Sequence, residues 1–148
     1  MKKIIHFPPF YFFSIVALNI VCPFLFPEFN DIPFPYNLSG LIGSMFGLFI
    51  LMKSSNLFHE KKTTFRLEKP TALVQNDFYK ISRNPMYLGA LIFIFGESVL
   101  MGNRISFICP ILFFLFINFL CIPPEEMMME KTFGRKYAEY KKNVRRWL

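Results

Sequence analysis

The 148-residue chain has few of the residues and motifs on which soluble enzymes usually depend. It has three cysteines and two histidines, whose spacing matches neither a zinc site nor a disulfide framework. It also lacks a glycine-rich dinucleotide loop, a phosphate-binding loop and a zinc-protease motif. We therefore expect no metal site and no ordinary soluble nucleotide-binding domain. Cys22, Cys109 and Cys121 are predicted to be buried thiols.

Charge is also nearly absent from four long stretches of the chain. Apolar residues make up 53% of the sequence, and 21 residues are phenylalanine. The apolar stretches are 10–26, 38–52, 86–101 and 105–122, and Glu97 is the one charged residue inside them. About 20 apolar residues cross a bilayer as a helix, so we predict about four transmembrane helices. A soluble bundle is disfavoured because these stretches offer no polar face.

Basic residues are distributed unevenly between the segments that join these stretches. With the N-terminus inside, Arg104 is the one basic residue in the outer segments, and the rest of the 17 lysines and arginines lie in inner segments. This asymmetry follows the positive-inside rule, so both termini are predicted to be cytoplasmic. The net charge of +7 then indicates an anionic membrane leaflet as the partner, and not a nucleic acid.

The sequence therefore predicts an all-α, multi-pass integral membrane protein with one domain, residues 1–148. A long inner segment, 53–85, and a helical tail, 123–148, are expected on the cytoplasmic side. The first stretch is interpreted as a retained span and not as a cleaved signal peptide, because no small-residue cleavage site follows it.

Prolines and glycines predict where these helices bend, end or touch. Pro23 is expected to kink or end the first span, and Pro110 to distort the last one. Pro123-Pro124 is expected to end the last span and can start another helix. Gly102-Asn103 should turn the hairpin between the last two spans. The GxxxG pattern of 43–47 lets another backbone approach closely, and we favour packing within the chain over dimerisation.

The tail carries one stripe of residues at helical spacing. Its members are Glu126, Glu130, Phe133, Tyr137, Tyr140 and Val144, and Gly134 is predicted to divide the tail into two helices. Such a stripe suits a cationic or aromatic ligand, and it equally suits an amphipathic helix on the bilayer. Glu97 is a functional hypothesis by default, but we favour a structural role bonded to a neighbour such as Asn118 or Asn19.

Two polar clusters are predicted to meet at the cytoplasmic mouth of the spans. Arg83 precedes Pro85 at the start of the third span, and an arginine beside a helix N-terminus forms an anion site. The Glu125-Glu126 pair follows the last span, and its carboxylates can accept hydrogen bonds from hydroxyl or ammonium groups. Because the last two spans form a hairpin, both clusters reach the same membrane face.

Three sequence pieces together resemble the isoprenylcysteine carboxyl methyltransferase and phospholipid methyltransferase superfamily. They are Leu73-Val74 with Tyr79; Arg83-Asn84-Pro85-Met86-Tyr87-Leu88-Gly89; and Glu125-Glu126 with Phe133-Gly134, Tyr137, Tyr140, Val144 and Arg146-Trp147. The resemblance covers about the last 90 residues of the chain. Many members have histidine at the position of Asn84 and glycine at that of Asp77, so this chain departs from the pattern at two places.

The resemblance implies S-adenosylmethionine as the cofactor, held on the cytoplasmic side. It implies cofactor contacts from Val74, Tyr79, Arg83, Asn84, Pro85, Tyr87, Gly89, Glu125 and Glu126. Within this set, Arg83 is expected to orient the cofactor carboxylate or an anionic substrate, and Glu126 to fix the cofactor amine or ribose. These two residues are the predicted catalytic pair.

The implied reaction is methyl transfer to a lipid-like acceptor that enters laterally from the membrane. An isoprenylcysteine carboxylate, a phospholipid amine and a small apolar thiol or acid all remain open as acceptors. Two alternatives also remain open. An NADPH-dependent membrane sterol or steroid reductase has a similar arginine–proline–tyrosine region, and a small membrane scaffold would have no enzymatic activity.

Overall fold

The structure of the protein is a computed structural model that describes residues 8–60 and 72–148. Side chains are described for these ranges except at positions 58–60. The segment 53–85 is therefore described only in part. Six of the basic residues behind the positive-inside prediction lie outside the described residues: Lys2, Lys3, Lys61, Lys62, Arg66 and Lys69.

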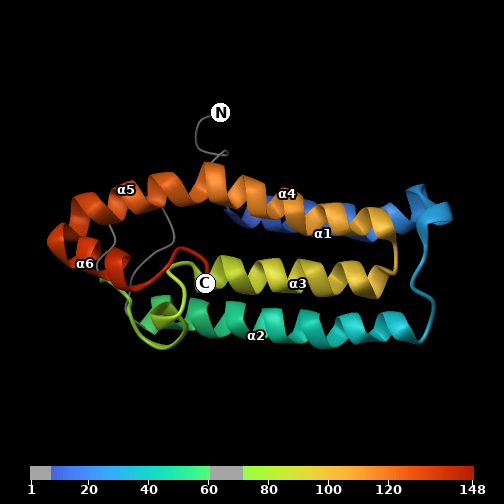
Figure 1. Cartoon of the computed structure of the whole chain (residues 1–148), viewed down its shortest axis with the longest axis horizontal. Coiled ribbons are helices and arrows are strands. Elements are labelled where there is room, and N and C mark those ends of the chain that lie inside the picture. The colour runs from blue at the N-terminus through green and yellow to red at the C-terminus, as the bar shows by residue number, and fades with distance from the viewer. Residues whose placement is uncertain (1–7, 61–71) are drawn as a thin grey trace.

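Four helices lie side by side and run in alternating directions (Figure 1). They are α1 (Pro8–Leu25), α2 (Ser39–Glu60), α3 (Pro85–Met101) and α4 (Ile108–Phe116). The remaining elements are η1 (Pro27–Phe29), η2 (Tyr36–Leu38), η3 (Asp77–Lys80), η4 (Arg104–Phe107), η5 (Ile117–Cys121), α5 (Ile122–Phe133) and α6 (Arg135–Asn143). No strand occurs within 8–60 and 72–148, so the predicted all-α fold is confirmed.

The described residues contain three helical runs that are long and apolar enough to cross a membrane. They are Pro8–Leu25, Tyr36–Leu57 and Arg104–Phe133, whereas the apolar α3 is shorter, with 17 residues. Many large apolar side chains point outward from these helices, including Phe24, Ile42 and Phe119. Such a surface suits lipid and not water. The number of four spans stays a prediction.

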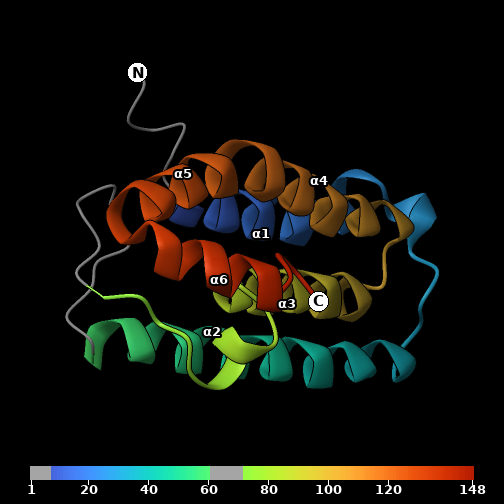
Figure 2. The ribbon, with the colours of Figure 1, turned by 60° about the vertical axis from the view of Figure 1, so that its left-hand side comes forward.

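The run Arg104–Phe133 is longer than a bilayer core requires. Its 30 residues extend about 45 Å as a helix, whereas the hydrocarbon core is about 30 Å thick. Its apolar part ends at Ile122, and the charged residues of the run after Arg104 lie in α5. α5 therefore projects beyond the membrane-spanning part, and α6 folds back beside it (Figure 2).

Glycines bring α2 and α3 into close contact. A Cβ atom added at Gly89 would lie 2.6 Å from the backbone nitrogen of Leu51 and 2.8 Å from the Gly47 carbonyl oxygen. Gly43 faces the Cα atom of Gly96. The GxxxG pattern thus packs within the chain, and this packing fixes α3 between α2 and the α1–α4 pair (Figure 1).

The prolines act differently from one another. Pro23 lies near the end of α1, as predicted, but the expected distortion at Pro110 is wrong. Pro110 lies in the first turn of α4, and the carbonyl of Ser106 that it leaves without an amide accepts the Ser98 hydroxyl at 2.9 Å. The irregularity occurs instead in η5, a π-helical turn just before Pro123-Pro124. A new α-helix, α5, then begins at Ile122 with these prolines in its first turn, as predicted.

Glu97 belongs to a buried group of polar side chains near the C-terminal end of α3. The Asn19 side-chain amide donates to Glu97 Oε2 at 3.2 Å and to Ser98 Oγ at 3.1 Å. Asn19 is therefore the partner of Glu97, and the alternative partner Asn118 is wrong, because Asn118 bonds the C-terminal residues instead. Gly102, with φ 69°, turns the chain from α3 to η4 as predicted.

Candidate functional site

A cavity of about 110 Å³ lies where α3 begins and α5 passes into α6. Its walls come from the segment before α3, the first turn of α3, and the facing sides of α5 and α6. The lining residues are Leu73, Val74, Tyr79, Arg83, Asn84, Met86, Tyr87, Glu125, Glu126, Met128, Met129, Tyr137 and Tyr140. Both polar clusters predicted from the sequence therefore meet in one cavity.

Two of the nine predicted contact residues lie outside this lining. Pro85 is the buried first residue of α3, where its missing amide costs no helical bond. Gly89 is one turn further on, where it packs against Leu51 of α2. These two residues position α3, while the other seven line the cavity.

Arg83 and Glu126 form the buried ion pair of the cavity. Arg83 Nη2 lies 3.2 Å from Glu126 Oε1, and the two side chains are only 8% and 9% exposed. The backbone of Arg83 is fixed by its amide, which donates to the Arg145 carbonyl at 3.0 Å. Arg83 Nε and Nη1 are buried and have no hydrogen-bond partner among the described residues. Two donors of this guanidinium are thus available to an anionic ligand.

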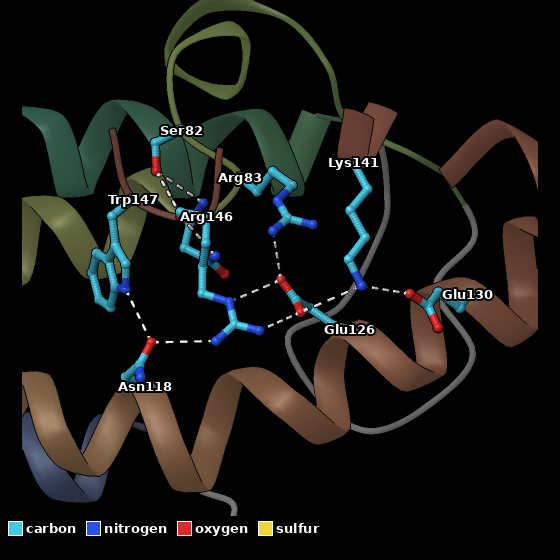
Figure 3. A network of polar contacts seen from close by, with 9 residues as sticks. Ser82, Arg83, Asn118, Glu126, Glu130, Lys141, Arg146 and Trp147 are labelled. Carbon is cyan, nitrogen blue, oxygen red and sulfur yellow. Dashed lines mark hydrogen bonds and ion pairs between the residues drawn. The ribbon is translucent and has the colours of Figure 1, made fainter. Parts of the chain in front are cut away.

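Glu126 is also bound from its other side (Figure 3). Arg146 donates from Nη2 to Glu126 Oε2 at 2.7 Å and from Nε to Oε1 at 3.3 Å. Lys141 Nζ lies 4.0 Å from Glu126 and 2.8 Å from Glu130. One carboxylate is therefore shared by two arginines, with a lysine at the edge, and its position is tightly fixed.

Arg146 belongs to residues 144–148, which we call the C-terminal strap. Contacts of this strap with the rest of the chain fix the position of Arg146. The Arg146 carbonyl accepts from Asn84 Nδ2 at 3.0 Å and from Ser82 Oγ at 3.2 Å. The indole of Trp147 donates to Asn118 Oδ1 at 3.1 Å, and its ring lies 5.0 Å from that of Phe114. Sequence reasoning did not assign Arg146 or Asn118 to the site. Arg146 lies in the strap, which follows α6 without helical periodicity, and Asn118 lies within a predicted apolar span.

Glu125 has a different environment from its neighbour. Its Oε1 accepts the Tyr87 hydroxyl at 2.6 Å. Burial raises the pKa of Glu125 to about 7; the Tyr87 bond lowers this pKa and the nearby Glu126 raises it. None of the ion pairs within the described ranges includes Glu125. It is therefore a half-buried carboxyl group that titrates near neutral pH.

Tyrosines of the tail stripe close the cavity. The Tyr140 hydroxyl donates to the Tyr79 carbonyl at 2.6 Å, which ties α6 to η3. Burial raises the pKa of Tyr137 to about 12, so this side chain stays neutral. The stripe thus turns Glu126, Tyr137 and Tyr140 inward, which favours the ligand alternative over a helix that lies on the bilayer.

Asp77 keeps the backbone that the resemblance implied. This residue opens η3 with φ 52°, a left-handed conformation that glycine adopts freely and aspartate tolerates better than most residues. Its side chain is exposed and does not line the cavity. The departure from glycine at this position therefore leaves the adjacent cavity residue Tyr79 in place.

Comparisons with known proteins show which sequences this chain is similar to. A family model described as phospholipid methyltransferase matches residues 36–136, more than half of the chain. An uncharacterised protein of Haemophilus influenzae is 40% identical over 63 residues, which cover 43% of this chain and all of that protein. No solved structure gives a significant match.

Two plant relatives carry functional names. Protein-S-isoprenylcysteine O-methyltransferase B of Arabidopsis thaliana is 37% identical over 79 residues, 53% of this chain and 40% of its own length. A probable protein-S-isoprenylcysteine O-methyltransferase of Oryza sativa subsp. indica is 33% identical over 72 residues, 49% of this chain and 38% of its length. The chain thus spans about two fifths of these relatives. Together with the apolar helices, the family match shows that this integral membrane protein belongs to the phospholipid methyltransferase family.

Proposed function

We propose that the protein transfers a methyl group from S-adenosylmethionine to a lipid-like acceptor, with the cavity and both termini on the cytoplasmic side. One observation carries the cofactor assignment. The guanidinium of Arg83 is buried in the cavity, where Nε and Nη1 have no partner among the described residues, beside two carboxylates and four tyrosines. A ligand that brings a carboxylate, an ammonium group and a sulfonium into one small volume matches that set of groups.

The residues of the cavity fit the parts of this cofactor. The free donors of Arg83 suit the carboxylate of the cofactor, because a guanidinium group can bind a carboxylate through two parallel hydrogen bonds. Glu126 and Glu125 suit its ammonium group or ribose hydroxyls, and the ring of Tyr87 or Tyr137 suits a sulfonium by cation–π attraction. Val74, Tyr79 and Asn84 complete the proposed contact set. When bound, the cofactor supplies an already activated methyl group.

The remainder of the cofactor requires space next to this cavity. A wider, open hollow of about 740 Å³ shares Leu73 and Tyr140 with it. We assign the adenosyl portion to this hollow, and the methyl group to the inner cavity. The chain then acts by holding the acceptor and the methyl group in line, which by itself supplies much of a transfer rate.

The acceptor is proposed to be an amphiphile of the isoprenylcysteine carboxylate or phospholipid amine class. The names of the plant relatives and of the family model support these classes. The outward-facing apolar side chains of the helices support entry of the acceptor from the bilayer.

Cofactor binding tests this proposal directly. S-adenosylmethionine and NADPH would each be titrated into the detergent-purified full chain by calorimetry, with the wild type, Arg83→Ala and Arg104→Ala. Arg104 is the matched control, because it is an exposed arginine that pairs with Asp31 at the other end of the molecule. We expect saturable binding of S-adenosylmethionine alone, at least about 100-fold weaker in Arg83→Ala, where a charge-assisted contact is lost.

Other results would favour the alternatives. Binding of NADPH alone would support the membrane reductase, and binding of neither ligand to folded protein would support the scaffold. Equal loss of binding in both variants would show that net charge, and not the buried guanidinium, holds the ligand. Circular dichroism of each variant confirms that it is folded.

A further inference from the structure

Both carboxylate oxygens of Glu126 are paired with arginines in this structure. Oε1 lies 3.2 Å from Arg83 Nη2 and accepts a hydrogen bond from Arg146 Nε at 3.3 Å. Oε2 accepts a shorter hydrogen bond, of 2.7 Å, from Arg146 Nη2. The Glu126 side chain is only 9% exposed, so little room is left around it. A ligand that reaches this carboxylate therefore meets two guanidinium groups already bound there (Figure 3).

An ammonium group would be a third cation at the same carboxylate. Like charges in a buried site disfavour one another strongly. Lys141, which lies 4.0 Å from Glu126, pairs more closely with Glu130, at 2.8 Å. An ammonium group therefore binds Glu126 well only if one of the two arginines leaves it.

The two arginines differ in how easily they can leave. The Arg83 side chain is 8% exposed, and its backbone amide is fixed by the Arg145 carbonyl. The Arg146 side chain is 35% exposed, and its hydrogen bond to Asn118 Oδ1 is long, at 3.4 Å, and involves a neutral acceptor. The guanidinium of Arg146 thus has a path into water, whereas that of Arg83 is enclosed.

We propose that Arg146 competes with the ammonium group of S-adenosylmethionine for Glu126, so that its guanidinium leaves this carboxylate when the cofactor binds. This inference rests on the proposed function and gives Arg146 a role in setting cofactor affinity. The exchange keeps Glu126 paired with a cation throughout, because a buried carboxylate without one is strongly disfavoured. Arg83 stays in place and offers Nε and Nη1 to the cofactor carboxylate.

The backbone of the strap has a separate role from the Arg146 side chain. The Arg146 carbonyl accepts hydrogen bonds from Ser82 Oγ and Asn84 Nδ2, and the Arg145 carbonyl accepts one from the Arg83 amide. These bonds hold the segment that enters α3 and do not involve the guanidinium of Arg146. The side chain can therefore exchange while the strap keeps Arg83 where it is.

Competition of this kind acts in both directions. If the cofactor weakens the contact between Arg146 and Glu126, then that contact must weaken cofactor binding by the same factor. S-adenosylhomocysteine, which remains after the methyl group has been transferred, carries the same ammonium group. Return of Arg146 to Glu126 therefore also favours release of this product.

The first test compares two ligands that differ in the ammonium group. S-adenosylhomocysteine carries it, whereas its deamino analogue keeps the carboxylate and the adenosine without it. Both would be titrated by calorimetry into the detergent-purified full chain, as wild type, Arg146→Met and Lys142→Met. Lys142 is the matched control, because it is an exposed cation in the last turn of α6 that does not line the cavity.

The two ligands should respond differently to Arg146→Met. We expect S-adenosylhomocysteine to bind at least about 10-fold more tightly than to wild type, because a charge-assisted contact no longer competes with it. The affinity of the deamino analogue should not rise, because this ligand has no group that replaces Arg146 at Glu126. Lys142→Met should leave both affinities unchanged.

The second test follows the Arg146 side chain directly by nuclear magnetic resonance. In protein with isotope-labelled arginine, the Nε–H signal of Arg146 is identified by its absence in Arg146→Met. This group donates to Glu126 and should exchange slowly with water. Saturation with S-adenosylhomocysteine should speed the exchange at least about 10-fold, because the hydrogen bond is opened, whereas the deamino analogue should leave it slow.

Each contrary outcome identifies which proposal fails. An equal gain in affinity for both ligands would show that Arg146 merely obstructs the cavity, and a loss for both would show that it only supports the site. An unchanged affinity for S-adenosylhomocysteine, or an unchanged Nε–H exchange at saturation, would place the ammonium group elsewhere, such as at Glu125. All these results would overturn the exchange and leave the proposed function standing. Absence of binding of S-adenosylmethionine and S-adenosylhomocysteine in every folded variant would overturn both.

Discussion

Glu125 and Glu126 are neighbours in the chain, yet the fold gives them opposite surroundings. Successive residues of a helix point about 100° apart, so Glu126 faces the strap and Arg83 while Glu125 faces the start of α3. Glu126 is clamped by Arg83 and Arg146. Glu125 has one phenolic partner and a raised pKa. The comparison shows that a paired acidic motif can hold one fixed charge and one group that exchanges protons.

Removing the charge of Glu126 is the largest expected perturbation. Glu126→Gln should lower the free energy of unfolding by about 3 kcal/mol, because it leaves Arg83 buried without its anion and releases Arg146. Thermal denaturation in detergent, beside Glu130→Gln, would measure this loss. An equal effect of the two substitutions would mean that the clamp around Glu126 contributes no specific stability.

Glu125→Gln, one residue earlier, should instead raise the free energy of unfolding at neutral and higher pH. The pKa of Glu125 is raised from 4.5 to about 7, so folded protein holds this proton more tightly than unfolded protein. Wild-type stability must therefore fall as pH rises from about 4.5 to about 7, whereas Glu125→Gln lacks this dependence. At pH 8 the variant should be more stable by on the order of 2 kcal/mol, and at pH 4.5 nearly equal.

Melting temperatures at several pH values would measure the difference between Glu125→Gln and wild type. A difference that does not change between pH 4.5 and pH 8 would contradict the raised pKa. It would also remove the distinction between the two carboxylates.

Tyr87→Phe tests the bond that holds Glu125. Loss of this hydroxyl should cost about 1 kcal/mol at pH 8, because the ionised carboxylate loses its hydrogen bond. Since the bond lowers the pKa of Glu125, its removal should also move the titration upward. The pH midpoint of the stability change, compared with wild type, would measure this shift. A midpoint that moves downward would show that Tyr87 does not stabilise the charged form.

Lys141 should matter least. Its side chain is 42% exposed and lies 4.0 Å from Glu126, so solvent screens the interaction. Lys141→Met should change the free energy of unfolding by less than about 0.5 kcal/mol. Chemical denaturation would check this value. A larger loss would mean that Lys141, in addition to Arg83 and Arg146, contributes to stability through Glu126.

Features with a local cause were predictable from the sequence. The left-handed glycine at 134 divides α5 from α6, and the helix pairing through Gly43 and Gly47 follows from the spacing of small residues. The buried polar group of Asn19 and Glu97 was also foreseeable, because an isolated carboxyl group inside an apolar span requires a polar neighbour.

Features that depend on distant contacts were not predictable in this way. The ordinary helix start at Pro110 depends on another donor for the carbonyl of Ser106, here the Ser98 hydroxyl. No local pattern in the sequence indicates the π turn of η5. Arg146 reaches Glu126 from 20 residues away, through a strap that has no periodicity. The sequence placed both glutamates at one mouth, but their different surroundings follow only from the packing of α3 and the strap around α5.

The C-terminal strap also supplies an optical reporter without any labelling. Trp147 is the one tryptophan of the chain, so all indole emission comes from this position. Its ring packs on Phe114 and bonds Asn118, while the adjacent Arg146 binds Glu126 inside the cavity. Release of the strap would move the indole into a more polar setting and shift its emission to longer wavelength. Release of the strap can thus be followed in real time from the unmodified protein.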